Sequence, residues 1–266
     1  MIAIISDIHS NLEALEATLE AIRAERVARI LCLGDIVGYN ADPGGCIRLL
    51  RDSGAVCVAG NHDRAVTGQI TTEGFNPLAA RAVEWTRMRL GADDLDWLSR
   101  LPLKLDLAEE GSPGLVAVHG AIHPDTGCEL VRLDTDERRA LSFAALESHP
   151  SGARICAFGH THRIGIFEKR ESAVSAHQGD GAIIRDGSFY LVNPGTVGQP
   201  RSSDRRASFM LVDPAARTVQ VHRVSYDYRR AMAKTREAGL AARLSRVPEP
   251  FRGPIRRIYH AIRGRT

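Results

Sequence analysis

The sequence predicts an α/β protein in which two β-sheets pack together with helices on the outside. In the first 160 residues, short apolar runs rich in β-branched residues alternate with segments whose apolar residues recur at helical spacing, which is typical of β-α-β units. After residue 160, short strand-like runs follow one another, separated by turn signals such as Asp186-Gly187 and Asp213-Pro214. This second pattern indicates an antiparallel sheet. Two sheets packed against each other would account for the patterns in both parts of the chain.

The first part of the chain contains the strands and helices of the expected β-α-β units. The expected strands are Ile2–Ser6, Ile30–Leu33, Val56–Ala59, Leu115–Val118 and Ile155–Phe158. The expected helices are Leu12–Ala24, Gly45–Asp52, Pro77 to about Leu90, and Asp134–Glu147. Asn76 is a typical helix N-cap, and Pro77 suits the first helical position, so this pair marks a helix start.

The second part of the chain contains the strands of the expected antiparallel sheet, and a basic segment follows it. The expected strands are Ile164–Glu168, Ala182–Arg185, Phe189–Val192, Ser208–Val212 and Thr218–Val224. Residues 226–266 hold eleven basic and three acidic residues, a net charge of +8, which leaves −5 on residues 1–225 of a chain whose total is +3. We therefore expect a domain over 1–225 and a basic, partly helical C-terminal extension over 226–266, helical around Asp227–Leu244.

The composition is that of a globular protein, with 44% hydrophobic and 25% charged residues. No run approaches the roughly 18 apolar residues of a membrane span, and Ile2–Ile5 is too short for the core of a signal peptide. The five cysteines are scattered, with no C-x-x-C pair, and are interpreted as buried free thiols. We expect a cytoplasmic protein without a membrane segment, and a homo-oligomer stays open.

Metal-binding side chains follow each of the five strands expected in the first part. In order along the chain they are Asp7 and His9, Asp35, Asn61, His119, and His160 with His162. In an open α/β sheet, binding sites form beyond the carboxyl ends of the strands. We therefore predict that one edge of one sheet brings these seven side chains together, and that His149, His177, His222 and His260 lie on the surface.

The chemical types of these residues favour two divalent metal ions. Carboxylate, imidazole and amide ligands suit manganese, iron, zinc or nickel, whereas the absence of cysteine ligands argues against a structural zinc. Seven ligands are too many for one ion and suit two ions that share a carboxylate at about 3.5–4 Å separation. A single Asp-x-His turn is usually a capping feature, but five such strand ends in one chain favour a metal site.

The ordered set of motifs resembles the calcineurin-like metallophosphoesterase family. The motifs are Asp7-x-His9, Gly34-Asp35, Gly60-Asn61-His62-Asp63, His119-Gly120 and Gly159-His160-Thr161-His162. The segment Asn193 to Arg201 is similar to one in small prokaryotic phosphodiesterases, and Gly34 to Pro43 is similar to diadenosine tetraphosphatase-like members. The resemblance covers roughly residues 1–225 and implies a four-layer α/β/β/α sandwich with two mixed sheets and flanking helices.

The resemblance also implies a role for each site residue. Asp7, His9 and His162 would hold one metal ion, Asn61, His119 and His160 the other, and Asp35 would bridge them. Manganese is the preferred ion, with iron, zinc, nickel or magnesium as alternatives. His62, oriented by Asp63 and charged because Asp63 raises its pKa, would protonate the leaving oxygen while water attacks phosphorus.

The implied activity is metal-dependent hydrolysis of a small phosphoester or nucleotide. Family members that act on proteins carry an arginine shortly after the bridging aspartate, and here residues 36–40 contain none. A phosphodiesterase or dinucleoside polyphosphate hydrolase is therefore favoured over a phosphomonoesterase or a Ser/Thr-type protein phosphatase. Arg201 and Tyr39 are the expected substrate-binding residues, through a second phosphate and through stacking on a base or ring, although Tyr39 equally suits ordinary loop packing. A non-catalytic metal-binding scaffold is the rival class, and a nucleic acid substrate is disfavoured.

Overall fold

The computed structural model describes residues 1–107 and 113–241, which form two mixed six-stranded sheets. The first sheet, in the order β3-β2-β1-β11-β12-β9, consists of β1 (Ile2–Ile5), β2 (Arg29–Cys32), β3 (Val56–Cys57), β9 (Gly181–Ile183), β11 (Ala207–Asp213) and β12 (Thr218–Val224). The second, in the order β4-β5-β6-β10-β7-β8, consists of β4 (Lys104–Leu107), β5 (Leu115–Val118), β6 (Ile155–Ala157), β7 (Ile164–Arg170), β8 (Ala173–Ala176) and β10 (Phe189–Pro194).

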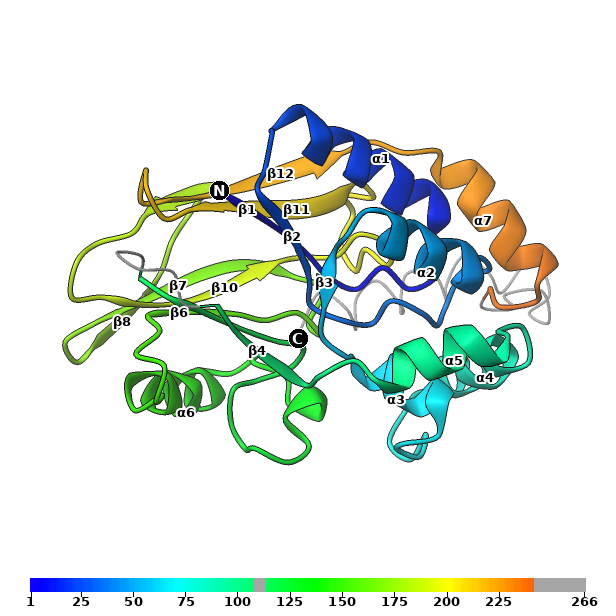
Figure 1. Ribbon diagram of the computed structural model, residues 1–266, viewed down its shortest axis with the longest axis horizontal. Helices are drawn as coiled ribbons and strands as arrows, with labels where there is room; N and C mark the ends of the chain where they lie inside the picture. Colours follow the sequence, from blue (N-terminus) through cyan, green and yellow to red (C-terminus); the bar gives the residue numbers. More distant parts are fainter. Residues whose placement is uncertain (108–112, 242–266) are drawn as a thin grey trace, which may run out of the picture.

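The two sheets stack face to face between helices, so the expected four-layer α/β/β/α sandwich is confirmed (Figure 1). On the outer side of the first sheet lie α1 (Leu12–Ala24), α2 (Pro43–Asp52) and α7 (Tyr228–Glu237), and α6 (Asp136–Glu147) covers the second sheet. At one end of the sandwich lie α3 (Asn61–Thr67), α4 (Pro77–Arg87) and α5 (Ala92–Ser99). As expected, the side chain of Asn76 caps α4, accepting a hydrogen bond from the Ala79 N–H at 2.9 Å.

The apolar runs of the central strands are continuous because both faces of each sheet are buried. In β1, Ile2 and Ile4 face the core between the sheets, whereas Ala3 and Ile5 pack into the core that includes α1. The residues of β5 divide in the same way between the inter-sheet core and the core beneath α6. Strands covered on both faces lose the alternating pattern of half-exposed strands. The buried central strands therefore form a rigid frame for the loops at their ends.

The two halves of the chain do not form one sheet each, which corrects the sequence-based expectation. The strands β9, β11 and β12 extend the first sheet, because the free edge of β1 pairs antiparallel with β11, with Ile2 opposite Val212. In the second sheet, β10 from the second half pairs parallel with β6. The short elements α3, α5, β4 and β8 were not predicted, because none of them carries the continuous apolar run or the helical periodicity of the predicted elements.

The helix at the start of the predicted C-terminal extension is docked against the body. The Nζ atom of Lys234 in α7 lies 2.6 Å from the carboxylate of Glu13 and 3.0 Å from that of Asp42. Helix α7 ends earlier than predicted, at Glu237, and Gly239 after it has a φ of 73°, a conformation that suits glycine. The rest of the extension, residues 242–266, lies outside the described residues. Within the described part of the chain, no helix is both long and apolar enough to cross a membrane.

Candidate metal centre and substrate cleft

The seven predicted ligands converge at one end of the sandwich, but from both sheets and not from one. The loops after β1, β2 and β3 carry the first four ligands, and these strands belong to the first sheet. The loops after β5 and β6 carry His119, His160 and His162, and these strands belong to the second sheet. The site is therefore built between the facing edges of the two sheets.

Five of the seven ligands adopt a left-handed backbone conformation that residues other than glycine rarely take. Their φ angles are 55° for Asp7, 49° for His9, 51° for Asp35, 61° for His160 and 59° for His162. Such conformations cost on the order of 1–3 kcal/mol each and persist only where surrounding structure fixes them. Here backbone hydrogen bonds do so, as between the Asp7 N–H and the Gly34 carbonyl at 3.1 Å.

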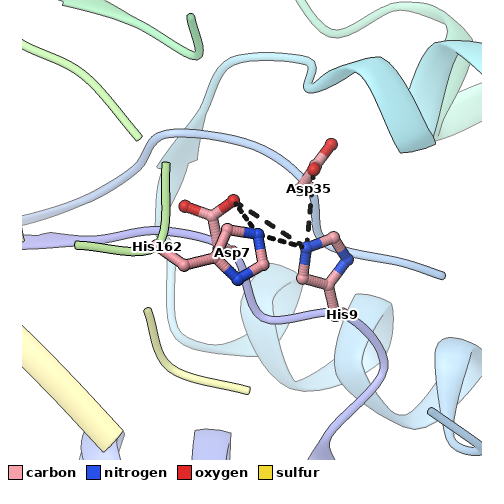
Figure 2. Close-up of side chains that lie close together, drawn as sticks. All are labelled: Asp7, His9, Asp35 and His162. Carbon is pink, nitrogen blue, oxygen red and sulfur yellow. Dashed lines mark hydrogen bonds and ion pairs between the residues drawn. The ribbon is translucent and has the colours of Figure 1, made fainter. Parts of the chain in front are cut away.

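The first cluster of ligands contains Asp7, His9, Asp35 and His162 (Figure 2). The Nε2 atom of His162 lies 3.1 Å from Oδ1 of Asp7 and 3.2 Å from Nε2 of His9. The same nitrogen of His9 is 3.5 Å from Oδ2 of Asp35. All four side chains are buried, with at most 6% of any residue exposed.

The second cluster contains Asp35, His119 and His160, and Asn61 adjoins it. The Nε2 atom of His119 lies 3.4 Å from Oδ2 of Asp35, 3.2 Å from Oδ1 of Asn61 and 3.2 Å from Nδ1 of His160. The Oδ2 atom of Asp35 thus faces a histidine of each cluster. Close packing allows this approach, because a Cβ atom at Gly60 would overlap the Asp35 carboxylate.

The hydrogen bonds around the clusters leave acceptor atoms facing one another. The Nδ1 atoms of His9, His119 and His162 contact the backbone carbonyls of residues 37, 33 and 199, which assigns the ring proton to Nδ1 in each. In the neutral rings, the Nε2 lone pairs therefore point at the carboxylates and at each other. Among the described residues, Oδ1 of Asp7 is buried without a hydrogen bond partner. This arrangement fits divalent cations, which would satisfy all these acceptors at once.

The excess of acceptor atoms also shifts the pKa values of Asp35 and His119. Burial alone would raise the pKa of Asp35, but the imidazoles of His119 and His62 hold it well below its usual range. Burial would lower the pKa of His119, yet the Asp35 carboxylate raises it to about 9. In the metal-free protein a proton on His119 therefore offsets part of the negative charge. A bound cation would displace that proton, since metal ligands must be deprotonated.

His62 lies beside the clusters, and its buried surroundings disfavour the positive charge that was expected on its imidazole. Burial lowers its pKa to about 4, although the Asp35 carboxylate acts in the opposite direction. Its ring packs between those of Tyr39 and Phe75, at centroid distances of 4.9 and 5.0 Å. Its Nδ1 atom is buried without a hydrogen bond to any described residue. The pKa shift is therefore opposite to the one expected from Asp63, and His62 is neutral in the free protein at pH 7.

The Asp63 carboxylate contacts backbone N–H groups and not the ring of His62. It accepts hydrogen bonds from Ile36 and Val37 at 2.9 and 3.1 Å and from Gly60 at 2.9 Å. These bonds tie the loop that carries Asp35 to the start of α3. Burial and the Asp35 charge raise the pKa of Asp63 to about 7, which the positive charge of bound cations would counteract. Asp63 thus acts on His62 only through the backbone.

The predicted substrate-binding residues Arg201 and Tyr39 both line the cleft over the second cluster. Arg201 is exposed, and its side chain forms no hydrogen bond or ion pair with the residues that the structure describes. Tyr39 is only 7% exposed, its ring contacts His9 and His62, and its hydroxyl accepts a hydrogen bond from Asn76 at 3.1 Å. The ring of Tyr39 is therefore mostly engaged in loop packing.

Two residues of the cleft were missed by sequence reasoning. Phe75 is half-buried and borders the cleft beside His62, so its ring offers more surface to a ligand than Tyr39 does. Arg132 reaches the cleft from the loop after the short helix η1 (Cys128–Leu130), where its Nη1 atom lies 3.4 Å from the His160 carbonyl. Neither belongs to a strand-end motif, and only the fold brings them to the site.

The protein is a four-layer sandwich with two buried imidazole–carboxylate clusters that share one aspartate. This arrangement is typical of a binuclear metal centre. Residues 1–217 match the calcineurin-like phosphoesterase superfamily domain. The chain belongs to this superfamily and is a metallophosphoesterase, as its motifs indicated.

Individual proteins are similar to this chain over most of its length. The chain is 36% identical over 234 residues to an uncharacterised protein of Methanocaldococcus jannaschii, covering 88% of this chain and 91% of the relative. It is 37% identical to the crystal structure of a metallophosphoesterase from Sphaerobacter thermophilus, with a TM-score of 0.72 and coverage of 90% and 95% of the two chains. A hypothetical protein from Pyrococcus horikoshii shares the fold, with a TM-score of 0.72 at 18% identity over 91% and 95% of the two chains.

Proposed function

We propose that the protein hydrolyses phosphodiesters or dinucleoside polyphosphates with two divalent metal ions. The observation that carries the proposal is the Asp35 carboxylate shared by two complete ligand clusters, with His62 beside them and an unpaired arginine, Arg201, at the cleft. A non-catalytic scaffold would need neither His62 nor an arginine directed to the cleft. The combination supports catalysis over the scaffold alternative.

The ligand assignment that we propose follows the two clusters. Asp7, His9 and His162 would hold one ion, and Asn61, His119 and His160 the other, with Asp35 between them. Two bound cations supply charge neutralisation at the phosphate oxygens and lower the pKa of water. Manganese suits the mixture of carboxylate, imidazole and amide donors, as do iron, zinc, nickel and magnesium to different degrees.

Three side chains around the clusters would act on the substrate or on its surroundings. His62 faces the cleft as a neutral imidazole, and negative charge developing on a leaving oxygen would raise its pKa and so favour proton transfer through it. Asp63 would hold the loop of Asp35 and the start of α3 in register through its three backbone hydrogen bonds. Arg201 would contact a phosphate oxygen, because a guanidinium binds phosphate through paired hydrogen bonds.

The loop after Asp35 supports a diester over a phosphoprotein substrate. Gly38, in the run where protein phosphatases of this family carry an arginine, lies directly against the His62 ring, and a Cβ atom there would overlap its Nδ1. No long side chain fits at this position. A monoester dianion, which carries more charge than a diester, would lose the guanidinium that usually neutralises it.

The proposal is tested by an activity screen of protein stripped of metal and reloaded with manganese, iron, zinc, nickel or magnesium. Bis-(p-nitrophenyl) phosphate, p-nitrophenyl phosphate, a dinucleoside polyphosphate and a phosphopeptide are compared by kcat/KM. We expect the diester and the dinucleotide to exceed the monoester and the phosphopeptide. A phosphopeptide or monoester with a higher kcat/KM than both would overturn the substrate class and leave the metal centre standing.

The five free, buried cysteines support the expected cytoplasmic location.

A further inference from the structure

The cleft over the metal centre has two depressions, and Arg201 borders both. One has a volume of about 370 Å³ and is lined by His62, Phe75, Asn61 and His160. The other has a volume of about 400 Å³ and is lined by His162 as well as by Arg201. Each volume lies in the range of small-molecule sites, roughly 300–1,000 Å³. Each depression thus borders one ligand cluster, the first at Asn61 and His160 and the second at His162.

The two depressions differ in chemistry. The first presents the ring of Phe75 and the imidazole of His62. The second presents four guanidinium groups against one carboxylate, and these residues are Arg163, Arg201, Arg206, Arg223 and Asp204. Hydroxyl groups of Thr196, Ser202 and Ser208 complete its polar lining. An excess of arginine over acid in a concave site favours an anion with several oxygen atoms.

Ion pairs hold two arginine side chains of the second depression in position, but they do not neutralise the charge of every arginine there. Arg206 forms a bidentate pair with Asp204, with Nη2 2.8 Å from Oδ2 and Nε 3.1 Å from Oδ1. Arg223 lies 2.7 Å from Asp180, which is not one of the lining residues, and 3.7 Å from Asp204. Arg201 has no such partner among the described residues. The depression therefore keeps positive charge while the ion pairs restrict the side chains.

We propose that this arginine-lined depression is a subsite for a second phosphate of the substrate. That phosphate is carried by the ester substituent that remains bonded to the phosphorus after the leaving group has departed. The inference rests on the proposed hydrolase function. It follows from the position of His62, which borders only the first depression. The leaving group belongs beside His62, on the aromatic side, so the other ester substituent lies toward the arginine-lined depression. The substrate class is thus a phosphodiester whose retained side bears a further phosphate.

A matched pair of chromogenic substrates tests the subsite. The p-nitrophenyl ester of thymidine 5′-phosphate is compared with the same ester carrying an additional 3′-phosphate. In both, water adds its oxygen to the 5′-phosphorus, the bond to the aryl oxygen breaks, and nitrophenolate leaves. The products are thymidine 5′-phosphate and thymidine 3′,5′-bisphosphate. We expect kcat/KM of the wild-type protein to be roughly tenfold or more higher for the ester with the extra phosphate, the usual value of charged hydrogen bonds.

Two variants and a matched control assign that preference to the depression. Arg206→Gln and Arg223→Gln lie on different segments, and each should reduce the preference by roughly tenfold while leaving kcat/KM of the simpler ester unchanged. Arg205→Gln is the control, because Arg205 lies over the ring of Tyr228 at 4.6 Å and not in the lining. It should keep the full preference. Equal rates for both esters in the wild-type protein, or a preference unaffected by both variants, overturn the subsite.

A binding measurement separates this inference from the proposed function. Calorimetric titration of the metal-loaded protein with the two products should show tighter binding of the bisphosphate, lost in Arg206→Gln and kept in Arg205→Gln. If neither ester is hydrolysed but this binding pattern holds, the hydrolase proposal fails and the anion subsite stands. If both esters turn over and the two products bind equally, the hydrolase proposal stands and the subsite fails.

Discussion

Among the described residues, two groups of carboxylate and histidine side chains differ in their fitness for a metal ion: the metal centre suits one, and the group around Glu168 and His177 does not. In the second group, the carboxylate of Glu168 in β7 is 3% exposed. Its Oε1 accepts hydrogen bonds from Ser188 at 2.8 Å and Tyr190 at 3.0 Å, and its Oε2 contacts His177 at 2.8 Å and Arg185 at 2.9 Å. Each oxygen is thus satisfied by groups that carry protons.

The metal centre has similar residue types, but its acceptor atoms outnumber its protons even with a proton on His119. There, imidazole Nε2 atoms face carboxylate oxygens and one another, and Oδ1 of Asp7 is left without a partner among the described residues. A cluster of donors around one acceptor is complete as it stands, whereas a cluster of acceptors needs a cation. The count of protons, and not the presence of histidine and acid, therefore distinguishes a metal site from a structural ion pair network.

The largest effect is expected for Asp35→Asn, which removes the carboxylate common to both metal clusters. Metal content, measured by elemental analysis after loading and dialysis, should fall from about two ions per chain. Phosphodiesterase activity should fall by about 10⁴-fold or more, since several kcal/mol of charge stabilisation are lost. Glu168→Gln, the equivalent change in the other group, should keep both ions and full activity. A variant that retained two ions and its activity would refute the shared role of Asp35.

The two histidines His62 and His177 should separate catalysis from structure. We expect His62→Ala to leave metal content nearly intact and to reduce turnover by roughly 10²–10⁴-fold, the usual contribution of a general acid. The loss should be smaller for esters of p-nitrophenol, which need little protonation, than for alkyl esters. His177→Ala is the control and should change neither. An equal loss on good and poor leaving groups would count against proton donation by His62.

Metal loading should stabilise the fold through one group of residues only. A metal at 100 times its dissociation constant should raise the free energy of unfolding by about 2.7 kcal/mol, provided that it binds only the folded chain. Urea unfolding with and without manganese measures this increment. It should persist in Glu168→Gln and shrink strongly in Asp35→Asn. The same increment in both variants would show that the metal binds elsewhere.

The smallest effect concerns the Glu168 group and its dependence on pH. Burial would raise the pKa of Glu168, but hydrogen bonds from Ser188 and Tyr190 together with His177 and Arg185 lower it below 4.5. The ionised carboxylate therefore stabilises the fold above about pH 4.5, and this contribution is lost as the pH falls through the lowered pKa. Glu168→Gln should lose about 1–2 kcal/mol in urea unfolding of the metal-free protein at pH 7. The gap to wild type should narrow in acid, and a constant gap would contradict this account.

The sequence predicted the fold class and the convergence of the candidate ligands because both depend on local signals, although it placed the ligands on one sheet instead of two. Apolar runs mark the central strands, and the residue types that follow Ile5 or Ala157 are chemically distinctive wherever the strands are placed. The interleaving of the sheets was not predictable in this way. It depends on β11 choosing the free edge of β1, a pairing between segments about 200 residues apart.

Features that depend on tertiary environment were predicted poorly. Phe75 and Arg132 carry no motif, and only packing places them at the cleft. The charge of His62 was assigned from its neighbour Asp63, but burial dominates its pKa and Asp63 bonds to backbone groups elsewhere. Glu168 lies within β7 and His177 follows β8, and no motif in the sequence marks their contact across this hairpin. A residue type indicates a chemistry, whereas its charge state depends on everything packed around it.

The pairing of ligands across the two sheets also fixes when the metal centre can exist during biosynthesis. His9 and His162 are neighbours in the first cluster although 153 residues separate them along the chain. At translation rates of about 5–20 residues per second, roughly 10–30 s pass between the synthesis of these two ligands. No nascent chain shorter than 162 residues carries the complete set. The N-terminal Asp-x-His pair therefore leaves the ribosome as an incomplete chelator, and full metal selection is made by the assembled sandwich.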